Sequence, residues 1–114
     1  MDSDPVTTNP DHYRTVFENE RVRVLEYREK RGDRTNVHAH PDSMMVTLSS
    51  FRRRLVSGDR EVEVELEAGG TRWLAAQEHI GENIGETETH VIFVELKEPV
   101  AADDLRLGQL GPQE

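Results

Sequence analysis

The sequence predicts an all-β domain folded as a small antiparallel barrel. Apolar and polar residues alternate in short runs, and turn-forming residues separate these runs at intervals of about 8–12 residues. No window of about 11 or more residues carries the apolar stripe of an amphipathic helix. Because only 34% of the residues are hydrophobic and 32% are charged, a compact closed sheet is the arrangement that buries enough apolar surface.

The chain of 114 residues has the length of one domain. Residues 1–12 carry Pro5 and Pro10 among polar residues, which predicts a flexible N-terminal lead-in. The barrel is predicted over residues 13–100, and residues 101–114 form a C-terminal extension. Three leucines of this extension are expected to dock on the barrel or on a partner subunit: Leu105, Leu107 and Leu110.

Alternation along the chain predicts the individual strands. Residues 21–24 alternate arginine with valine, and residues 61–67 alternate glutamate with apolar residues without a break. Such a run places the glutamates on one face of a strand and the apolar side chains on the other. Residues 89–96 also favour a strand, with apolar residues on both faces. Turns are expected between the strands at residues 31–33, 57–59, 68–70 and 84–86.

Composition excludes several classes of function. The net charge of −9 argues against nucleic-acid binding, which requires a basic surface. The absence of cysteine excludes disulfides, thiolate nucleophiles and thiolate metal sites. No apolar run approaches the roughly 20 residues of a membrane span, and the acidic N-terminus is unlike a secretory signal. We therefore expect a cytoplasmic protein with neither a nucleic-acid nor a membrane partner.

Among the five histidines, His38 and His40 are the most informative pair. Two residues apart on a strand, their side chains point to the same face and lie about 6.5–7 Å apart along it. Two imidazoles placed in this way can bind one metal ion, because metal–nitrogen bonds are about 2.0–2.2 Å long. An isolated H-x-H pair is more often a surface or structural feature, so its meaning depends on the rest of the chain.

Two segments resemble the two sequence motifs of the cupin superfamily. The stretch from Gly32 to His40 has the order G-x5-H-x-H of the first motif, and the stretch from His79 to Asn83 has the H-x3-N order that closes the second. The resemblance covers about residues 16–97. Its specificity comes from the occurrence of both motifs, at this separation, within an all-β pattern.

Cupins are small β-barrels of the jelly-roll type, also called double-stranded β-helices, and many bind one metal ion at the mouth of the barrel. The resemblance implies that His38, His40 and His79 bind one divalent transition-metal ion. Iron is the expected metal, with manganese, nickel, copper and zinc as alternatives. The resemblance also implies that Asn83 helps to fix the turn behind the third histidine.

The sequence departs from the family pattern at the fourth ligand. The usual glutamate of the first motif is expected three or four residues after the second histidine, where this chain has Met44 and Met45. Three neutral imidazoles leave the full charge of the ion and two or three open positions, which favours an anionic chelating substrate. The two methionines and Asp42 are alternative ligands, but apolar packing and a turn are their expected roles.

Two further groups of residues are expected around the site. His90 begins the last predicted strand and is a candidate catalytic acid or base, with a half-exposed strand-end residue as the alternative. His12 is expected to be solvated. Glu78 and Glu82 flank the third histidine, where they either orient its ring or, as we favour, lie exposed.

Candidate substrate-binding residues are Arg53, Trp73 and Phe93. Arg53 would pair with an anionic substrate if its strand face is internal. The favoured alternative is a solvated stripe of arginines at 52–54 that faces the glutamates of 61–67 across a hairpin. Trp73 and Phe93 are expected to be walls of the core or of a pocket.

These observations favour a metal-dependent enzyme that carries out dioxygenase-like oxidation of a small chelating substrate, such as a β-diketone or an enolate. Three-histidine cupins include dioxygenases of this kind, so this expectation is an analogy based on the ligand set. The alternatives are a non-catalytic or regulatory cupin that binds a small molecule, and a metal-assisted isomerase or lyase with His90 as base. A homodimer that pairs exposed sheet edges is also expected.

Overall fold

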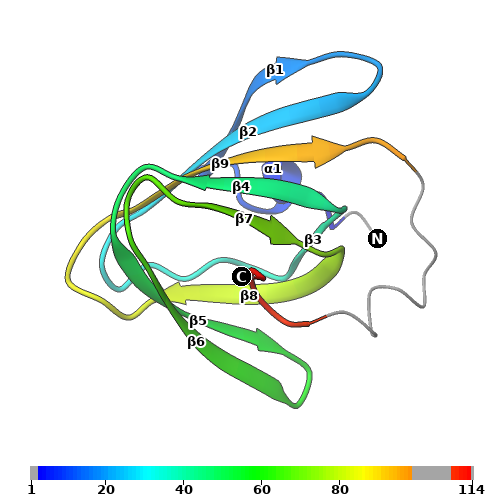
Figure 1. The fold of residues 1–114 in the computed structure, drawn as a ribbon. Helices are drawn as coiled ribbons and strands as arrows, with labels where there is room; N and C mark the ends of the chain where they lie inside the picture. Colours follow the sequence, from blue (N-terminus) through cyan, green and yellow to red (C-terminus); the bar gives the residue numbers. More distant parts are fainter. Residues whose placement is uncertain (1–2, 99–108, 114) are drawn as a thin grey trace.

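The computed structural model describes residues 3–98 and 109–113, and it consists almost entirely of β-strands (Figure 1). One short helix, α1 (Pro5–Thr8), lies near the start of the chain. Among the described residues, nine strands follow it: β1 (Tyr13–Glu18), β2 (Val22–Glu29), β3 (His38–His40), β4 (Ser43–Thr47), β5 (Phe51–Ser57), β6 (Arg60–Leu66), β7 (Thr71–Leu74), β8 (Gln77–Asn83) and β9 (Thr89–Leu96). No helix in this part of the chain has the length and apolar character needed to cross a membrane.

The strands form two antiparallel sheets. The first sheet has the order β1-β2-β9-β4-β7, and the second has the order β3-β8-β5-β6. Several hydrogen-bonded neighbours are distant in sequence, including β2 with β9 and β3 with β8. Figure 1 shows the two sheets facing each other, with the chain passing repeatedly from one to the other. The all-β antiparallel architecture predicted from the sequence is confirmed.

The core lies between the two sheets and is built by strand alternation. Strand β9 buries every second side chain, and Val91 and Phe93 are only 1% and 2% exposed. The intervening side chains point to the outer wall because successive residues of a strand face opposite sides. The buried apolar cluster consists of Tyr13, Leu25, Tyr27, Met45, Phe51, Leu66, Leu74, Val91 and Phe93.

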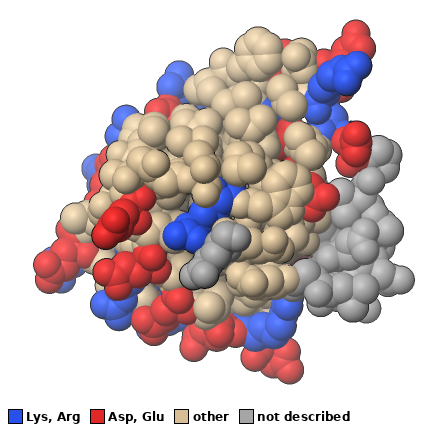
Figure 2. Space-filling model, viewed as in Figure 1, with Lys and Arg blue, Asp and Glu red and all other residues tan. Residues whose placement is uncertain are grey.

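The predicted strand over residues 61–67 forms β6, which pairs with β5 in a hairpin. A two-residue turn joins the two strands, and its first residue, Gly58, has a φ of +61°. A type II′ turn requires this left-handed conformation at its first central position, and glycine adopts it without steric strain. Acidic and basic side chains are intermixed over this part of the surface (Figure 2).

Residues 3–12 pack against the barrel, which differs from the flexible lead-in expected for residues 1–12. Asp4 caps α1 by accepting a hydrogen bond from a helix amide, and Pro5 is buried at the first helical position. Asn9 is 4% exposed, and its side-chain oxygen accepts a hydrogen bond of 2.7 Å from the amide of Asn36. The local signal for this order was an N-cap residue followed by proline, which together begin a helix.

Only residues 109–113 of the predicted C-terminal extension over residues 101–114 are described. The amide of Gln113 donates a hydrogen bond of 2.8 Å to the carbonyl of Trp73, so this segment lies along the edge of β7. Leu110 is half-buried. Two of the leucines that are expected to dock lie outside the described residues: Leu105 and Leu107.

Candidate metal centre

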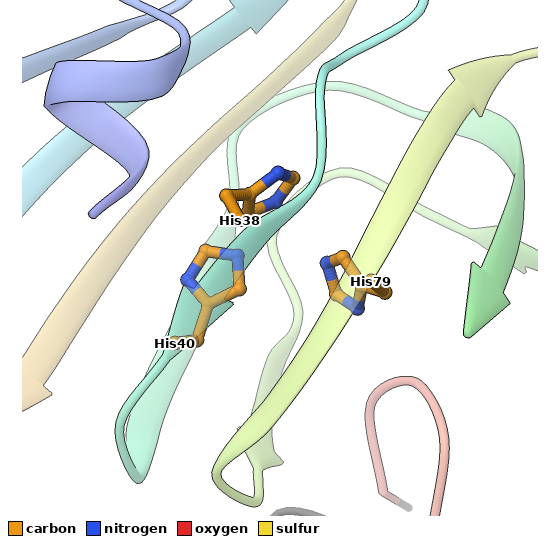
Figure 3. Close-up of side chains that lie close together, drawn as sticks. All are labelled: His38, His40 and His79. Atoms are coloured by element: carbon orange, nitrogen blue, oxygen red, sulfur yellow. The ribbon is translucent and has the colours of Figure 1, made fainter. Parts of the chain in front are cut away.

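Three histidine rings meet inside the barrel from two neighbouring strands. His38 and His40 lie on β3 and His79 lies on β8, and the antiparallel register places His38 directly opposite His79. Opposite residues of an antiparallel pair face the same side of the sheet, so all three rings point inward (Figure 3). They are 0%, 1% and 4% exposed, and one ring nitrogen of each lies within 4.8 Å of the others.

Hydrogen bonds to the Nδ1 atoms orient two of the rings. Nδ1 of His38 donates to the carbonyl oxygen of Asn36 at 2.8 Å, and Nδ1 of His79 donates to Oε1 of Gln77 at 2.8 Å. The amide nitrogen of Gln77 donates to two backbone carbonyls, so its oxygen must face the imidazole. Because a neutral imidazole carries one N–H, Nε2 of both histidines is an acceptor with a lone pair.

His40 is held by its aromatic neighbour and by a buried carboxylate. Its ring stacks on Phe93, with ring centroids 4.9 Å apart. Its Nδ1 lies 3.7 Å from Oε2 of Glu95, which is longer than a hydrogen bond. Neither of these two buried atoms has a hydrogen-bond partner among the described residues. Two nitrogens of Arg23 lie 2.8 Å from the other oxygen of Glu95, so the carboxylate is fixed beside the ring.

Burial keeps the three imidazoles neutral. Desolvation, followed by the neighbouring His40, lowers the pKa of His38 to about 3. Desolvation also lowers the pKa of His40, and it lowers the pKa of His79 well below the usual value, with the other two imidazoles as a second cause. All three side chains therefore carry a lone pair at neutral pH, which is the protonation state that binds a metal ion.

The donor set fits one transition-metal ion. Neutral imidazole nitrogen is a ligand suited to iron, copper, nickel and zinc. The hydrogen bond of His79 to Gln77 is made through Nδ1, which leaves Nε2 as the ring nitrogen that can bind an ion. Two nitrogens bound to one ion at about 2.1 Å lie at most about 4.2 Å apart. A small inward movement of the rings is enough to reach this separation from the observed limit of 4.8 Å.

Solved structures with the same fold include a cupin domain from Bordetella pertussis Tohama I. It is 27% identical to this chain, and the match covers 75% of this chain and 92% of that one with a TM-score of 0.70. The chain has the cupin fold. The three histidines that the sequence motifs predicted lie close together in this fold.

Two more distant structures share only the fold of this chain. A cupin superfamily protein from Desulfitobacterium hafniense DCB-2 is 12% identical, covering 75% of this chain and 76% of that one with a TM-score of 0.56. A cupin family protein with a double-stranded β-helix fold from Methanocaldococcus jannaschii is 13% identical, covering 74% and 77% of the two chains with a TM-score of 0.59. No protein-family model matches the sequence. No curated protein matches it either.

Arg53 lies inside the barrel, unlike the arginines beside it. Its Nε donates to Oε1 of Glu29 at 3.0 Å, and a terminal nitrogen donates to the hydroxyl of Tyr27 at 3.1 Å. A side chain at Gly81 would collide with the guanidinium, so glycine provides the space for it. The internal face that a substrate anchor requires is therefore present, although this guanidinium already has a carboxylate partner.

The neighbours of Arg53 form the solvated stripe that the sequence favoured for all three arginines. Arg52 lies 3.1 Å from a carboxylate oxygen of Glu63 across the β5–β6 hairpin. Arg54 lies 3.7 Å from the other oxygen of Glu63 and 3.6 Å from Glu82. The prediction is correct for these two residues and wrong for the residue between them, because strand alternation turns only that side chain inward.

His90 and Trp73 lie outside the site. His90 points to the outer wall of β9, where its Nε2 is 2.8 Å from Oε2 of Glu26. This position corrects the acid–base role expected for His90, because the buried residues on either side of it are the ones that face inward. Trp73 is paired with Met44, which is 38% exposed, so it faces outward and does not line the site. Phe93, by contrast, forms a wall of the site.

The alternative ligands adopt the structural roles that were expected of them. Met45 is 5% exposed in the apolar core. The side chain of Asp42 accepts a hydrogen bond of 2.8 Å from the amide of Ala76, which holds a turn. Glu78 is exposed. Asn83 fixes the turn after β8, because its side chain donates to the carbonyl of Thr87 at 2.8 Å and accepts from a turn amide at 3.0 Å.

Sequence reasoning missed three residues that contact the histidines. Gln77 and Glu95 face the rings as described above, and the hydroxyl of Tyr13 lies 3.2 Å from Nε2 of His38 and 3.3 Å from Nε2 of His40. Gln77 is two residues before a predicted ligand on the same strand, so strand alternation alone could have identified it. Tyr13 has no such signal, because β1 reaches the site only through the tertiary fold.

Two hollows adjoin the histidines. An open depression of about 600 Å³ is lined in part by His40 and Glu95. A small internal cavity of about 20 Å³ lies beside His79, Phe93 and Arg53. A cavity of this size holds about one water molecule. The space directly around the rings is therefore largely filled by protein, and the larger opening lies beside His40.

Proposed function

We propose that this cupin binds one divalent transition-metal ion, with iron as the proposed metal, and uses it to oxidise a small chelating substrate with O₂. The observation that carries this proposal is the convergence of three buried, neutral imidazoles. The Nδ1 atoms of His38 and His79 are engaged by acceptors and that of His40 lies beside a carboxylate, which leaves Nε2 as the ring nitrogen available to an ion. Neutral imidazoles with oriented rings are the form in which histidine binds a metal ion.

An iron ion in this position would supply a Lewis acid and a one-electron redox centre. The residues of the chain determine what such a site can accept. Three neutral ligands add no negative charge, so an anionic bidentate substrate such as an enolate is favoured over a neutral one. Phe93 and its aromatic neighbours keep water away from the rings, which strengthens electrostatic interactions inside the barrel. The support for dioxygenase-like chemistry is analogy with other three-histidine cupins.

The enclosed interior supports a second candidate function, in which the protein binds a metal ion or a small ligand without catalysis. The three histidines are at most 4% exposed, and the internal cavity beside His79 has a volume of only about 20 Å³. A substrate larger than a few atoms would have to enter from the depression beside His40 and displace protein side chains. Turnover therefore distinguishes the two candidates.

Elemental analysis of protein purified without a metal-affinity column tests the metal site. We expect about one transition-metal ion per chain in the wild type and almost none in His38→Ala, since two imidazoles bind an ion far more weakly than three. His90→Ala is the matched control, because it removes a histidine on the outer wall and should retain the ion. Equal metal contents in the two variants would refute the proposed site.

Oxygen consumption separates the two candidate functions. The metal-loaded wild type would be presented with small β-diketones, hydroxyketones and thiols, with loaded His38→Ala as the negative control. Substrate-dependent O₂ uptake that disappears in the variant supports the oxidase or dioxygenase function. A loaded protein that binds these compounds and consumes no O₂ supports the non-catalytic function.

We also propose that the protein is a homodimer formed through β1. Within the described residues, β1 is an edge strand of the five-stranded sheet, so one side of its backbone is free to pair with another chain. Val16 and Phe17 on this strand are 43% and 54% exposed. Light scattering should give twice the mass of the chain, and a monomeric mass across a range of concentrations would overturn this proposal.

A further inference from the structure

The hydroxyl of Tyr13 occupies a position beside the metal centre that no cupin motif assigns. Tyr13 lies on β1, outside both motif segments, and is 2% exposed. Its ring packs between those of Tyr27 and Phe93, with centroid distances of 4.4 and 6.0 Å. This packing fixes the direction of the ring and carries the hydroxyl toward His38 and His40.

The distances from this hydroxyl to the two imidazoles are those between ligands of one ion. Two atoms bound to the same ion at about 2.0–2.1 Å, with an angle of about 90–109° between the bonds, lie about 2.9–3.4 Å apart. The hydroxyl oxygen of Tyr13 lies 3.2 Å from Nε2 of His38 and 3.3 Å from Nε2 of His40. These distances are compatible with one ion shared by the oxygen and both nitrogens.

The hydroxyl shares hydrogen bonds with the same two ring nitrogens that would bind an ion. A phenol has one O–H, so Tyr13 can donate to only one of the two nitrogens. Nε2 of His38 is an acceptor, because Nδ1 of that ring already donates to a carbonyl oxygen. The phenolic oxygen can in turn accept a hydrogen bond from His40 when that ring carries its proton on Nε2. A cation bound by the three atoms would take the place of these shared protons.

The first cupin motif usually supplies a glutamate as a fourth ligand, and this chain lacks that residue. The positions where the family's glutamate is expected hold Met44, which is 38% exposed, and Met45, which is buried in the core, and neither belongs to the metal-binding cluster. An oxygen donor from β1 would restore the three-nitrogen, one-oxygen set that the usual glutamate provides.

We propose that Oη of Tyr13 is the fourth protein ligand of the metal ion, in the place of the missing carboxylate. This inference rests on the proposed metal-binding function. When the ion binds, the phenolic O–H bond breaks, the oxygen forms a bond to the ion, and the proton passes to buffer, with no change of oxidation state. The ion then has one fewer position open to substrate than a site made of three histidines alone.

The test compares Tyr13→Phe with Tyr27→Phe. Each variant removes one buried hydroxyl and keeps the ring, but the hydroxyl of Tyr27 accepts a hydrogen bond from Arg53 and does not contact the histidines. Ferrous iron would be loaded without oxygen and then oxidised with ferricyanide. Zinc affinity would be measured in parallel by competition with a chromogenic chelator, and circular dichroism would verify the fold.

We expect a visible phenolate-to-iron charge-transfer band in the wild type and in Tyr27→Phe, and its loss in Tyr13→Phe. Zinc should bind about tenfold or more weakly to Tyr13→Phe than to the control. Iron-loaded wild type without the band, or a Tyr13→Phe variant with unchanged band and zinc affinity, would overturn this inference and leave the three-histidine site intact. A wild type that binds neither metal would overturn both proposals.

Discussion

The inner and outer walls of this barrel place residues of the same type in opposite environments. On the inner wall, burial lowers the pKa of His38 to about 3, and the ring donates a hydrogen bond to a neutral carbonyl. On the outer wall, His90 lies 2.8 Å from Glu26, whose pKa is lowered to about 2 by hydrogen bonds from Arg14 and His90. Exclusion of solvent thus separates a buried neutral imidazole, which could bind a metal ion, from an imidazole that lies beside a carboxylate on the outer wall.

The arginines show the same contrast at neighbouring positions. Arg53 is held inside by Glu29 and Tyr27, whereas Arg52 pairs with Glu63 in solvent. Breaking a buried pair leaves an uncompensated charge in a region of low dielectric, whereas an exposed pair loses little when it is broken. Position relative to the barrel wall, more than residue type, determines the energetic role of each side chain.

Replacing each arginine in turn tests this contrast. The loss of Arg53 should have the largest effect on the free energy of unfolding. Arg53→Ala leaves the carboxylate of Glu29 buried without its partner, so we expect the free energy of unfolding to fall by about 3–5 kcal/mol. Arg52→Ala removes an exposed pair and should cost less than about 1 kcal/mol. Urea denaturation measures both. Equal losses would show that the interior is more hydrated than its burial indicates.

The dependence of stability on acid pH also compares the inner wall with the outer wall. The expected change in the free energy of unfolding is smaller for each residue than for Arg53→Ala. In the fold, burial lowers the pKa values of His38, His40 and His79, whereas in the unfolded chain they return to about 6.5. Below pH 6.5 these three histidines therefore bind protons in the unfolded state and remain neutral in the folded state. The stability that these residues contribute is complete above pH 6.5 and is lost as the pH falls toward about 3.

The expected loss below pH 6.5 is about 1.4 kcal/mol per pH unit for each histidine that stays neutral. Glu26 on the outer wall acts in a lower window, because its folded pKa of about 2 affects stability only as the pH falls below its ordinary value of 4.5. Urea denaturation in the presence of a strong chelator should show the decline between pH 6.5 and 5. His38→Gln should show a shallower decline, and an identical slope in the variant would contradict the assignment.

Strand periodicity and turn residues predicted the all-β fold, and the resemblance to the two cupin motifs predicted the three histidines. His38 and His40 have the same side-chain direction on any strand, and the spacing to His79 matched a known pair of motifs. The direction of His90 was ambiguous, because residues 89–96 carry apolar side chains on both faces, so alternation did not identify the inner one. The inner face became clear only when β9 was placed between β2 and β4.

The supporting residues of the site were harder to predict because they come from tertiary neighbours. Glu95 follows an apolar run, and a carboxylate near a strand end is normally exposed, yet pairing with Arg23 allows it to be buried. Tyr13 reaches the histidines through the β1–β2 and β2–β9 ladders, which join segments at opposite ends of the chain. Local sequence patterns do not predict contacts between segments that are so far apart in the chain.

The ladder between β3 and β8 is only three residue pairs long. A slip of one residue along it would send the rings of His38 and His40 to the opposite side of the strand, since side chains alternate with a period of two. The nitrogens converge only when the two strands are aligned as in the native fold. An ion captured there would select that alignment by mass action, locking a short and otherwise weakly specified pairing in place.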